Sequence, residues 1–153
     1  MAADNEALVR SVIEALIDKK QAGLFSAMYA PDCEGSSPDG PMQGWDGFNS
    51  FFDKYNAAFP DFRVTVNYLL SAKDRVVVHY TFLGTHTGPL AGYPATGRTV
   101  KVPVIMNSRI SNSRIVEQHF LWDNLGPRRQ MWLASIAERE KSDSNPEFVG
   151  SAR

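Results

Sequence analysis

Gly84 to Arg98 reads GTHTGPLAGYPATGR, and Arg114 to Met131 reads RIVEQHFLWDNLGPRRQM. The first segment is rich in Gly and Pro, which mark a turn between two strands. The second begins as a strand of β-branched and aromatic residues, and the lone acid Asp123 stands where the apolar run ends. A carboxylate is costly to bury unless a partner or ligand uses it. Asp123 is therefore the first candidate for chemistry.

Strand-forming sequence extends on both sides of these segments. We predict four strands, over Phe62–Leu70, Arg75–Thr85, Arg98–Ile110 and Arg114–Asp123, because each is rich in β-branched or aromatic residues. The first and last of the three connections are short, which favours antiparallel pairing.

The first part of the chain has helical periodicity instead. Apolar residues at helical spacing predict helices over Asn5–Lys20, Phe25–Tyr29 and Trp45–Phe59. Residues 34–44 are polar and rich in turn-forming types, so we expect loops there, with a short strand near Cys33 at most.

These elements fit one domain. The chain has 153 residues, of which 43% are hydrophobic, enough for a substantial core. Helices followed by a four-stranded antiparallel meander predict an α+β fold, with helices packed on one face of a curved sheet that encloses a ligand cavity. We expect a single domain over residues 1–140, with a closing helix or extended tail over 125–136. Residues 141–153 are polar, and we expect them to be disordered.

Composition and charge exclude several classes of protein. The net charge is −1, so nothing favours binding to nucleic acid or to an anionic membrane. No stretch approaches the roughly 18 apolar residues of a membrane span, and the N-terminal residues lack the pattern of a signal peptide. The single cysteine, Cys33, fits a cytoplasmic protein and is expected to act as a small hydrophobic residue. No metal-binding or nucleotide-binding motif is present, so we expect neither a metal nor a nucleotide cofactor.

The last predicted strand has two distinct faces. Strict alternation places Ile115, Glu117, His119, Leu121 and Asp123 on one face, and Val116, Gln118, Phe120 and Trp122 on the other. Both faces carry apolar side chains. We therefore expect one face to cover a pocket and the other to pack against a second copy of the chain, which predicts a homodimer. Glu117 is expected to pair with Arg109 or Arg114.

The predicted pocket is lined by aromatic and polar side chains. Trp45, Phe48 and Phe52 recur at helical spacing, which is typical of core residues and also suits a pocket wall. The remaining candidates for the pocket are Tyr29, Tyr93, Asn107 and Leu121.

A series of short motifs runs through the chain in a fixed order. They are Phe59-Pro60-Asp61, Gly84-Thr85-His86, Gly88, Gly92-Tyr93-Pro94, Thr96-Gly97, Arg109, Ile115, Glu117, Asp123 and Gln130-Met131. In these motifs, and over about Ala7 to Met131, the chain resembles the SnoaL-like polyketide cyclases, within the NTF2-like (cystatin-like) superfamily of α+β cones. It departs from the family pattern in two places: Ser113-Arg114 replaces a Gly-Lys turn, and His119 stands where Trp is common.

The resemblance implies a cofactor-free enzyme of natural-product metabolism, in which Asp123 acts as general acid/base. The family's best-known reaction is an intramolecular aldol ring closure of a polyketide, and relatives isomerise, rearrange or hydroxylate similar compounds. The expected substrate is a small hydrophobic carbonyl compound. An enolate intermediate needs a hydrogen-bond donor, and the candidates are His86, His119, Asn107 and Tyr93.

Other interpretations of these residues remain open. Asp123 is also suited to cap the following segment, His86 to stabilise its own hairpin, and His119 to lie in a core or subunit interface. A non-catalytic NTF2-like module that binds a small ligand or a protein is an alternative to the enzyme, and a cofactor-free hydroxylase is another.

Overall fold

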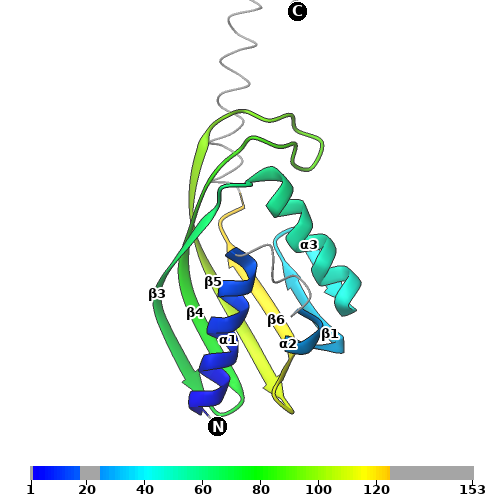
Figure 1. Ribbon diagram of the computed structural model, residues 1–153, viewed down its shortest axis with the longest axis vertical. Coiled ribbons are helices and arrows are strands. Elements are labelled where there is room, and N and C mark those ends of the chain that lie inside the picture. Colours follow the sequence, from blue (N-terminus) through cyan, green and yellow to red (C-terminus); the bar gives the residue numbers. More distant parts are fainter. Residues whose placement is uncertain (1, 18–24, 125–153) are drawn as a thin grey trace, which may run out of the picture.

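The computed structural model describes residues 2–17 and 25–124. The helices in this part of the chain are α1 (Ala2–Ile17), α2 (Phe25–Met28) and α3 (Gly44–Ala58). The strands are β1 (Tyr29–Ser37), β2 (Gly40–Gln43), β3 (Arg63–Ala72), β4 (Arg75–Thr85), β5 (Thr99–Ser111) and β6 (Arg114–Trp122). The predicted α+β architecture is confirmed: α1 and α3 lie on one side of a curved sheet (Figure 1).

The four predicted strands are present as β3 to β6, and each pairs antiparallel with the next. The β5–β6 turn consists of Asn112 and Ser113, whose φ angles are 50° and 59°. Two successive residues with positive φ make the tight turn that suits the twist of a hairpin. The short connections therefore produce the antiparallel order that the sequence predicts.

The prediction of loops over residues 34–44 is wrong. This segment holds the second part of β1, from Glu34 to Ser37, and all of β2, and the two form an antiparallel hairpin at the edge of the sheet. β1 also pairs in parallel with β6, so the sheet is a mixed sheet in the order β2-β1-β6-β5-β4-β3, rather than a four-stranded meander. Gly35 explains the error: a Cβ there would lie 1.8 Å from the carbonyl oxygen of Gln118. What resembles a turn signal is a close contact between strands.

The helices bury their apolar sides against the concave face of the sheet. In α1 the buried residues are Val9, Val12, Ile13 and Ala15, in keeping with the predicted helical spacing. In α3, Phe48 is fully buried and its ring lies 5.2 Å from that of Tyr29. Phe48, one of the aromatic residues at helical spacing in α3, therefore belongs to the core.

A bulge in β6 alters the predicted faces of that strand. Arg109 pairs with Glu117, whereas the next residue, Ile110, pairs with Ile115, so Val116 has no partner in the register. Ile115 therefore lies on the buried, concave side instead of sharing a face with Glu117. From Glu117 onward the alternation follows the prediction.

The predicted closing segment over 125–136 and the predicted tail over 141–153 lie outside the described residues. Within the described part of the chain, none of the helices has both the length and the apolar character that crossing a membrane requires.

Candidate active site

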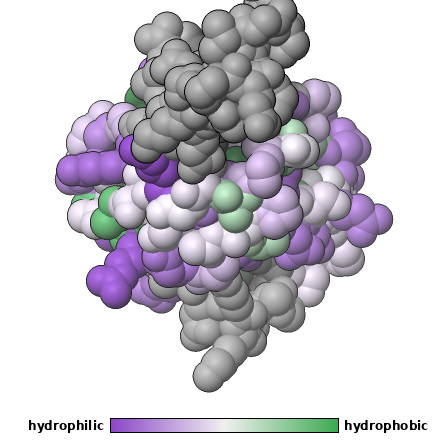
Figure 2. Space-filling model, turned by 90° about the horizontal axis from the view of Figure 1, so that it is seen from above, coloured by the Kyte–Doolittle hydropathy of each residue, from purple (hydrophilic) through white to green (hydrophobic). Residues whose placement is uncertain are grey.

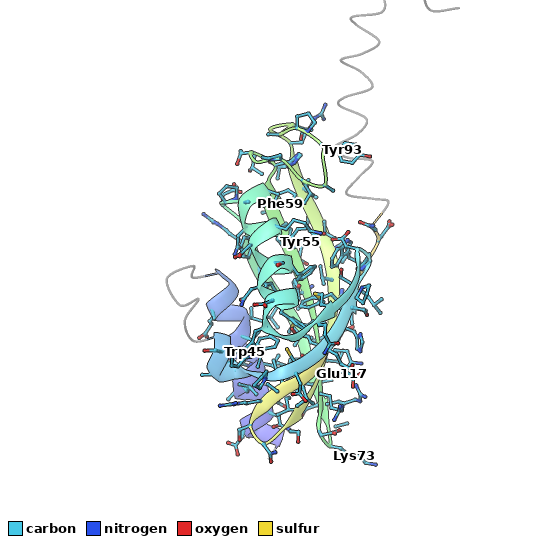
Figure 3. All side chains as sticks on the ribbon, turned by 90° about the vertical axis from the view of Figure 1, so that its right-hand side faces the viewer. Trp45, Tyr55, Phe59, Lys73, Tyr93 and Glu117 are labelled. Atoms are coloured by element: carbon cyan, nitrogen blue, oxygen red, sulfur yellow. The ribbon has the colours of Figure 1, made fainter. Side chains whose placement is uncertain are left out.

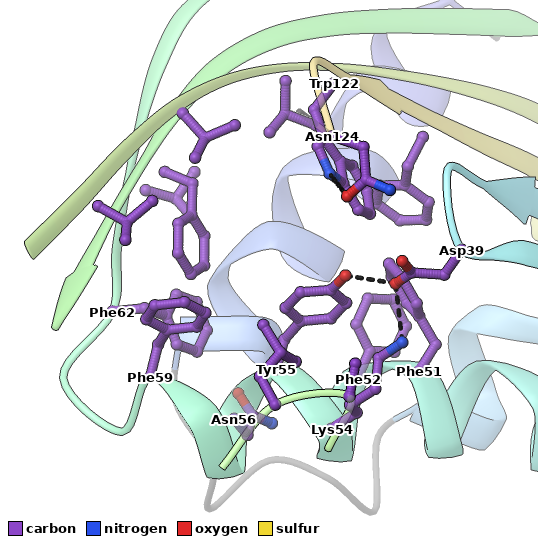
Figure 4. A pocket seen from close by; sticks show the side chains of 18 of the residues that line it. Asp39, Phe51, Phe52, Lys54, Tyr55, Asn56, Phe59, Phe62, Trp122 and Asn124 are labelled. Carbon is purple, nitrogen blue, oxygen red and sulfur yellow. Dashed lines mark hydrogen bonds and ion pairs between the residues drawn. The ribbon is translucent and has the colours of Figure 1, made fainter. Parts of the chain in front are cut away.

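A cavity of about 120 Å³ lies between α3, the concave face of the sheet and the β4–β5 connection. An apolar cavity of roughly 150 Å³ can hold benzene, so this cavity has room for about one ring. Its walls are mostly aromatic and aliphatic side chains, and a few polar groups stand among them (Figure 4). The apolar lining residues are Phe51, Phe52, Phe59, Phe62, Val64, Phe82, Leu90, Ala91, Val100, Val102, Val104, Phe120 and Trp122.

Aromatic rings from α3 and the strands form the walls of this cavity. The ring of Phe51 is stacked on that of Trp122, with 6.1 Å between centroids and 27° between planes. On the β3–β4 side, Phe62 is stacked on Phe82 with 5.4 Å between centroids. Flat walls of this kind suit a planar, apolar ligand.

Asp39, Lys54 and Tyr55 form a polar cluster at the edge of the cavity, and all three line it. The Nζ of Lys54 donates to Oδ2 of Asp39 over 2.7 Å, and the hydroxyl of Tyr55 donates to the same oxygen (Figure 4). The side chains of Asp39 and Lys54 are 19% and 36% exposed. The cluster therefore stands where the cavity meets solvent. Seen from above, a small apolar area lies among hydrophilic side chains (Figure 2).

The β4–β5 connection covers part of the cavity. Leu90, Ala91 and Tyr93 of this loop are lining residues. The loop is attached to the end of α3, because the backbone N–H groups of Thr87 and Gly88 both donate to the carbonyl oxygen of Ala58, each over 3.1 Å. Gly88, one of the glycines in the motifs of the sequence, thus helps to attach to α3 the loop that covers part of the cavity.

Asp123, the predicted acid/base, is exposed and does not line the cavity. Its neighbours Trp122 and Asn124 do line it, and Trp122 Nε1 donates to Asn124 Oδ1 over 3.4 Å. Alternation at the end of β6 directs these neighbours inward and leaves Asp123 outward. Its catalytic role stays a prediction.

His86 is fully buried but does not line the cavity. Its ring packs against Phe59, and its Nδ1 lies 3.0 Å from Oγ1 of Thr96. Burial lowers the pKa of the imidazole below its ordinary value of 6.5, because the charged form loses hydration. This position fits the alternative in which His86 stabilises its own hairpin, and a catalytic role stays a prediction.

His119 lies on the opposite, convex face of the sheet. Its Nδ1 is 2.7 Å from Ser36 Oγ, and its Nε2 is 2.9 Å from Oε1 of Glu117. Glu117 also accepts a hydrogen bond from Arg109 Nε over 2.9 Å, which confirms the predicted pairing with Arg109. Arg109 and His119, in that order, hold the pKa of Glu117 below its ordinary value.

The predicted pocket residues separate into three groups. Phe52 and Tyr93 line the cavity, whereas Tyr29 and Phe48 are buried outside its lining and Trp45 is partly buried against the core. Figure 3 places Tyr93, Phe59 and Tyr55 in succession from the loop end, with Trp45 nearer the start of α3. Asn107 and Leu121 belong to the convex face, because each pairs across the sheet with a residue of that face: Asn107 with His119, and Leu121 with Ile105.

Sequence reasoning missed the polar cluster. Asp39 stands in a Pro-Asp-Gly segment that reads as an ordinary turn, and Lys54 reads as a solvated residue on a helix. Tyr55 follows Phe52 by three residues and so continues the helical spacing of the aromatic residues in this helix, which is a signal that the sequence does contain. Within residues 2–17 and 25–124, no group of three or more His, Cys, Asp or Glu side chains is arranged to hold a metal ion.

Comparisons with known proteins agree with this fold. The sequence pattern of the SnoaL-like polyketide cyclase family matches residues 7–131. No curated protein sequence matches this chain. A candidate SnoaL-like polyketide cyclase from Jannaschia sp. CCS1 has a similar structure, with a TM-score of 0.81, 19% identity, and coverage of 86% of this chain and 93% of that one.

Two proteins from Streptomyces are also similar in structure. IdmH, a candidate polyketide cyclase from Streptomyces antibioticus, gives a TM-score of 0.72 at 24% identity, over 84% of this chain and 98% of its own. AclR, a candidate hydroxylase from Streptomyces galilaeus, gives 0.73 at 21% identity, over 90% and 98%. At such identities the likeness establishes the fold alone.

Proposed function

The chain belongs to the SnoaL-like polyketide cyclase family, and we propose that it is a cofactor-independent acid/base catalyst of natural-product biosynthesis. In this proposal it cyclises a polyketide-like carbonyl compound by an intramolecular aldol reaction, or isomerises it. The observation that carries the proposal is the aromatic cavity with a carboxylate, an ammonium and a phenol at its edge.

The size of the cavity limits how such a substrate would bind. Space for about one ring means that a polycyclic or chain-like substrate would insert one ring and leave the remainder at the opening. The carbonyl groups of the outer part would then lie near the polar cluster, where proton transfer is possible. An apolar interior with a few polar groups is typical of small-molecule sites.

Two carboxylates are candidates for the acid/base. The family resemblance assigns Asp123, whereas Asp39 is the carboxylate that lines the cavity. A carboxylate is a weak base at neutral pH. The substrate carbon is therefore expected to be a methylene between two carbonyls, which is acidic enough for a weak base.

The mass of the product tests the proposed reaction. Purified protein is incubated with aromatic polyketide intermediates that carry a 1,3-dicarbonyl group, and the products are analysed by mass spectrometry. Ring closure or isomerisation gives a product of unchanged mass, or one that has lost water. A gain of one oxygen atom with oxygen uptake would support the hydroxylase instead. Saturable binding without any product would support a non-catalytic module.

The homodimer is a further part of the proposal. Tyr68, His79, Ile105 and Leu121 form one row across β3, β4, β5 and β6 on the convex face, since each pairs with the next. Leu121 is 65% exposed and Leu70, on the same face, is 62% exposed. A second copy of the chain packed on this face would remove these apolar side chains from water.

A further inference from the structure

We propose that Asp39, Lys54 and Tyr55 are the reacting group of the cavity: Asp39 accepts the substrate proton, Lys54 stabilises the enolate oxygen, and Tyr55 positions Asp39. This inference rests on the proposed function and assigns the proton transfer to a residue other than Asp123. The substrate class that fits is a 1,3-dicarbonyl compound attached to a ring that enters the cavity.

The geometry brings the three side chains together from two separate elements. Asp39 lies in the turn between β1 and β2, and Lys54 and Tyr55 are consecutive residues near the end of α3. Both hydrogen bonds converge on a single oxygen, Oδ2 of Asp39. The carboxylate is therefore held in one orientation at the edge of the cavity, as a proton acceptor requires.

Lys54 has donor capacity beyond this bond. An ammonium group carries three N–H donors, and one of them is used in the bond to Asp39. The Nζ also lies 5.0 Å from the centroid of the Tyr55 ring, which helps to hold the charge in place. A substrate oxygen in the cavity opening can thus accept a hydrogen bond from a positive charge that is already oriented.

The aromatic walls make these charges more effective. Phe51, Phe52 and Trp122 line the same cavity and exclude water from one side of the cluster. A substrate that fills the opening would displace the remaining water, and an oriented donor in a water-excluded site stabilises a developing negative charge more strongly than it does in water.

The proposed steps balance without any other reactant. Asp39 removes the proton from the carbon between two carbonyls, and the C–H electron pair forms the enolate, whose oxygen is held by Lys54. The enolate carbon then bonds to the carbon of a third carbonyl group, elsewhere in the same molecule, and the π pair of that carbonyl moves to its oxygen. The alkoxide takes the proton back from Asp39. In an isomerisation, the proton returns to a different carbon instead.

A chromophoric phenol tests the binding part directly. 4-Nitrophenol has one ring, and its absorbance distinguishes the phenol from the phenolate, which resembles an enolate. We expect wild-type protein to shift bound 4-nitrophenol towards the phenolate. Asp39→Asn should shift it further, because a competing negative charge is removed, and Lys54→Met should shift it back. The absence of a saturable shift, or an unchanged shift in Lys54→Met, would overturn the assignment.

Turnover tests the catalytic part. We expect Asp39→Asn to lower kcat by ~10²–10⁴-fold and Lys54→Met by ~10²–10³-fold. Tyr55→Phe should lower kcat with little change in KM, because it disturbs the orientation of Asp39 and leaves the ring in the wall. Thermal unfolding must show that each variant is folded. Asp53→Asn and Lys101→Met, which alter exposed charges outside the cavity lining, serve as matched controls.

The two proposals fail in different ways. If Asp39→Asn keeps wild-type turnover while Asp123→Asn loses it, this inference is overturned and the proposed function stands. If wild-type protein converts no 1,3-dicarbonyl substrate, the proposed function fails, and the spectral titration still decides whether the cluster binds an oxyanion.

Discussion

The ring of Phe59 packs against the imidazole of His86, with 5.5 Å between the ring centroids. Phe59 lines the cavity, whereas His86 lies behind it at the base of the β4–β5 loop. The histidine also bonds to Thr96 on the far side of the same loop. A buried titratable group therefore supports both the cavity wall and the loop that covers it.

The stability of the protein should fall as the pH drops below about 6.5. Burial lowers the pKa of His86 in the folded state, so below the unfolded value of ~6.5 the unfolded chain binds more protons. The contribution of neutral His86 to the free energy of unfolding is therefore fully present above that value. It is lost as the pH falls towards the pKa of His86 in the folded protein. Urea unfolding between pH 5 and 8 measures this, with His86→Asn as the comparison. A wild-type slope equal to that of the variant would contradict the prediction.

The carboxylate of Glu117 affects stability in a more acidic pH range than His86 does. The pKa of Glu117 lies below its ordinary 4.5, so its contribution is lost only at more acidic pH. The effect of His86 is therefore separated above pH 5 from that of the Glu117 carboxylate.

Gly88→Ala should detach the β4–β5 loop from α3. A Cβ on Gly88 would lie 2.0 Å from the carbonyl oxygen of Ala57, so the backbone must move. We expect a loss of ~1–3 kcal/mol in the free energy of unfolding, as for other overpacked sites, together with weaker binding of 4-nitrophenol. Gly47→Ala in α3 is the control, because its Cβ would meet ordinary contacts at 3.4 Å or more. Equal stability of the two variants would show that the loop tolerates the extra atom.

Tyr29→Phe should destabilise the fold without altering the cavity. The hydroxyl of Tyr29 donates to Oε1 of buried Gln118, whose Nε2 donates to Ser108 Oγ over 2.9 Å. Removing the hydroxyl leaves a buried acceptor without this donor, which costs ~1–3 kcal/mol. Chemical denaturation measures the loss, and Tyr93→Phe is the matched control for stability because Tyr93 is 49% exposed. A similar effect of both substitutions would argue against the buried network.

Leu121→Glu should convert the proposed dimer into a monomer. The substitution places a charge at the β6 end of the exposed row on the convex face, where a second copy is expected to pack. Light scattering at micromolar concentration gives the mass, and Asn49→Glu on the exposed side of α3 is the control. A wild-type protein that is already monomeric would refute the proposed assembly.

The family resemblance and the local patterns correctly predicted the α+β fold. Alternating β-branched and aromatic residues predicted β3 to β6, because such patterns depend only on which face of a strand is buried. The aromatic stripe predicted α3 for the same reason. Phe52 and Tyr93, two of the predicted pocket residues, line the cavity, and their role towards a substrate stays a prediction.

The tertiary structure alone decided how distant segments meet. The parallel pairing of β1 with β6 brings together residues about 85 positions apart, and it depends on the close backbone contact at Gly35, which reads locally as a turn. The bulge at Val116 moved Ile115 to the other face, since one unpaired residue reverses the alternation. The cluster of Asp39, Lys54 and Tyr55 likewise forms only because the β1–β2 turn packs against α3. A sequence pattern reports the burial of each face, whereas the position of a polar side chain relative to a cavity depends on contacts between elements.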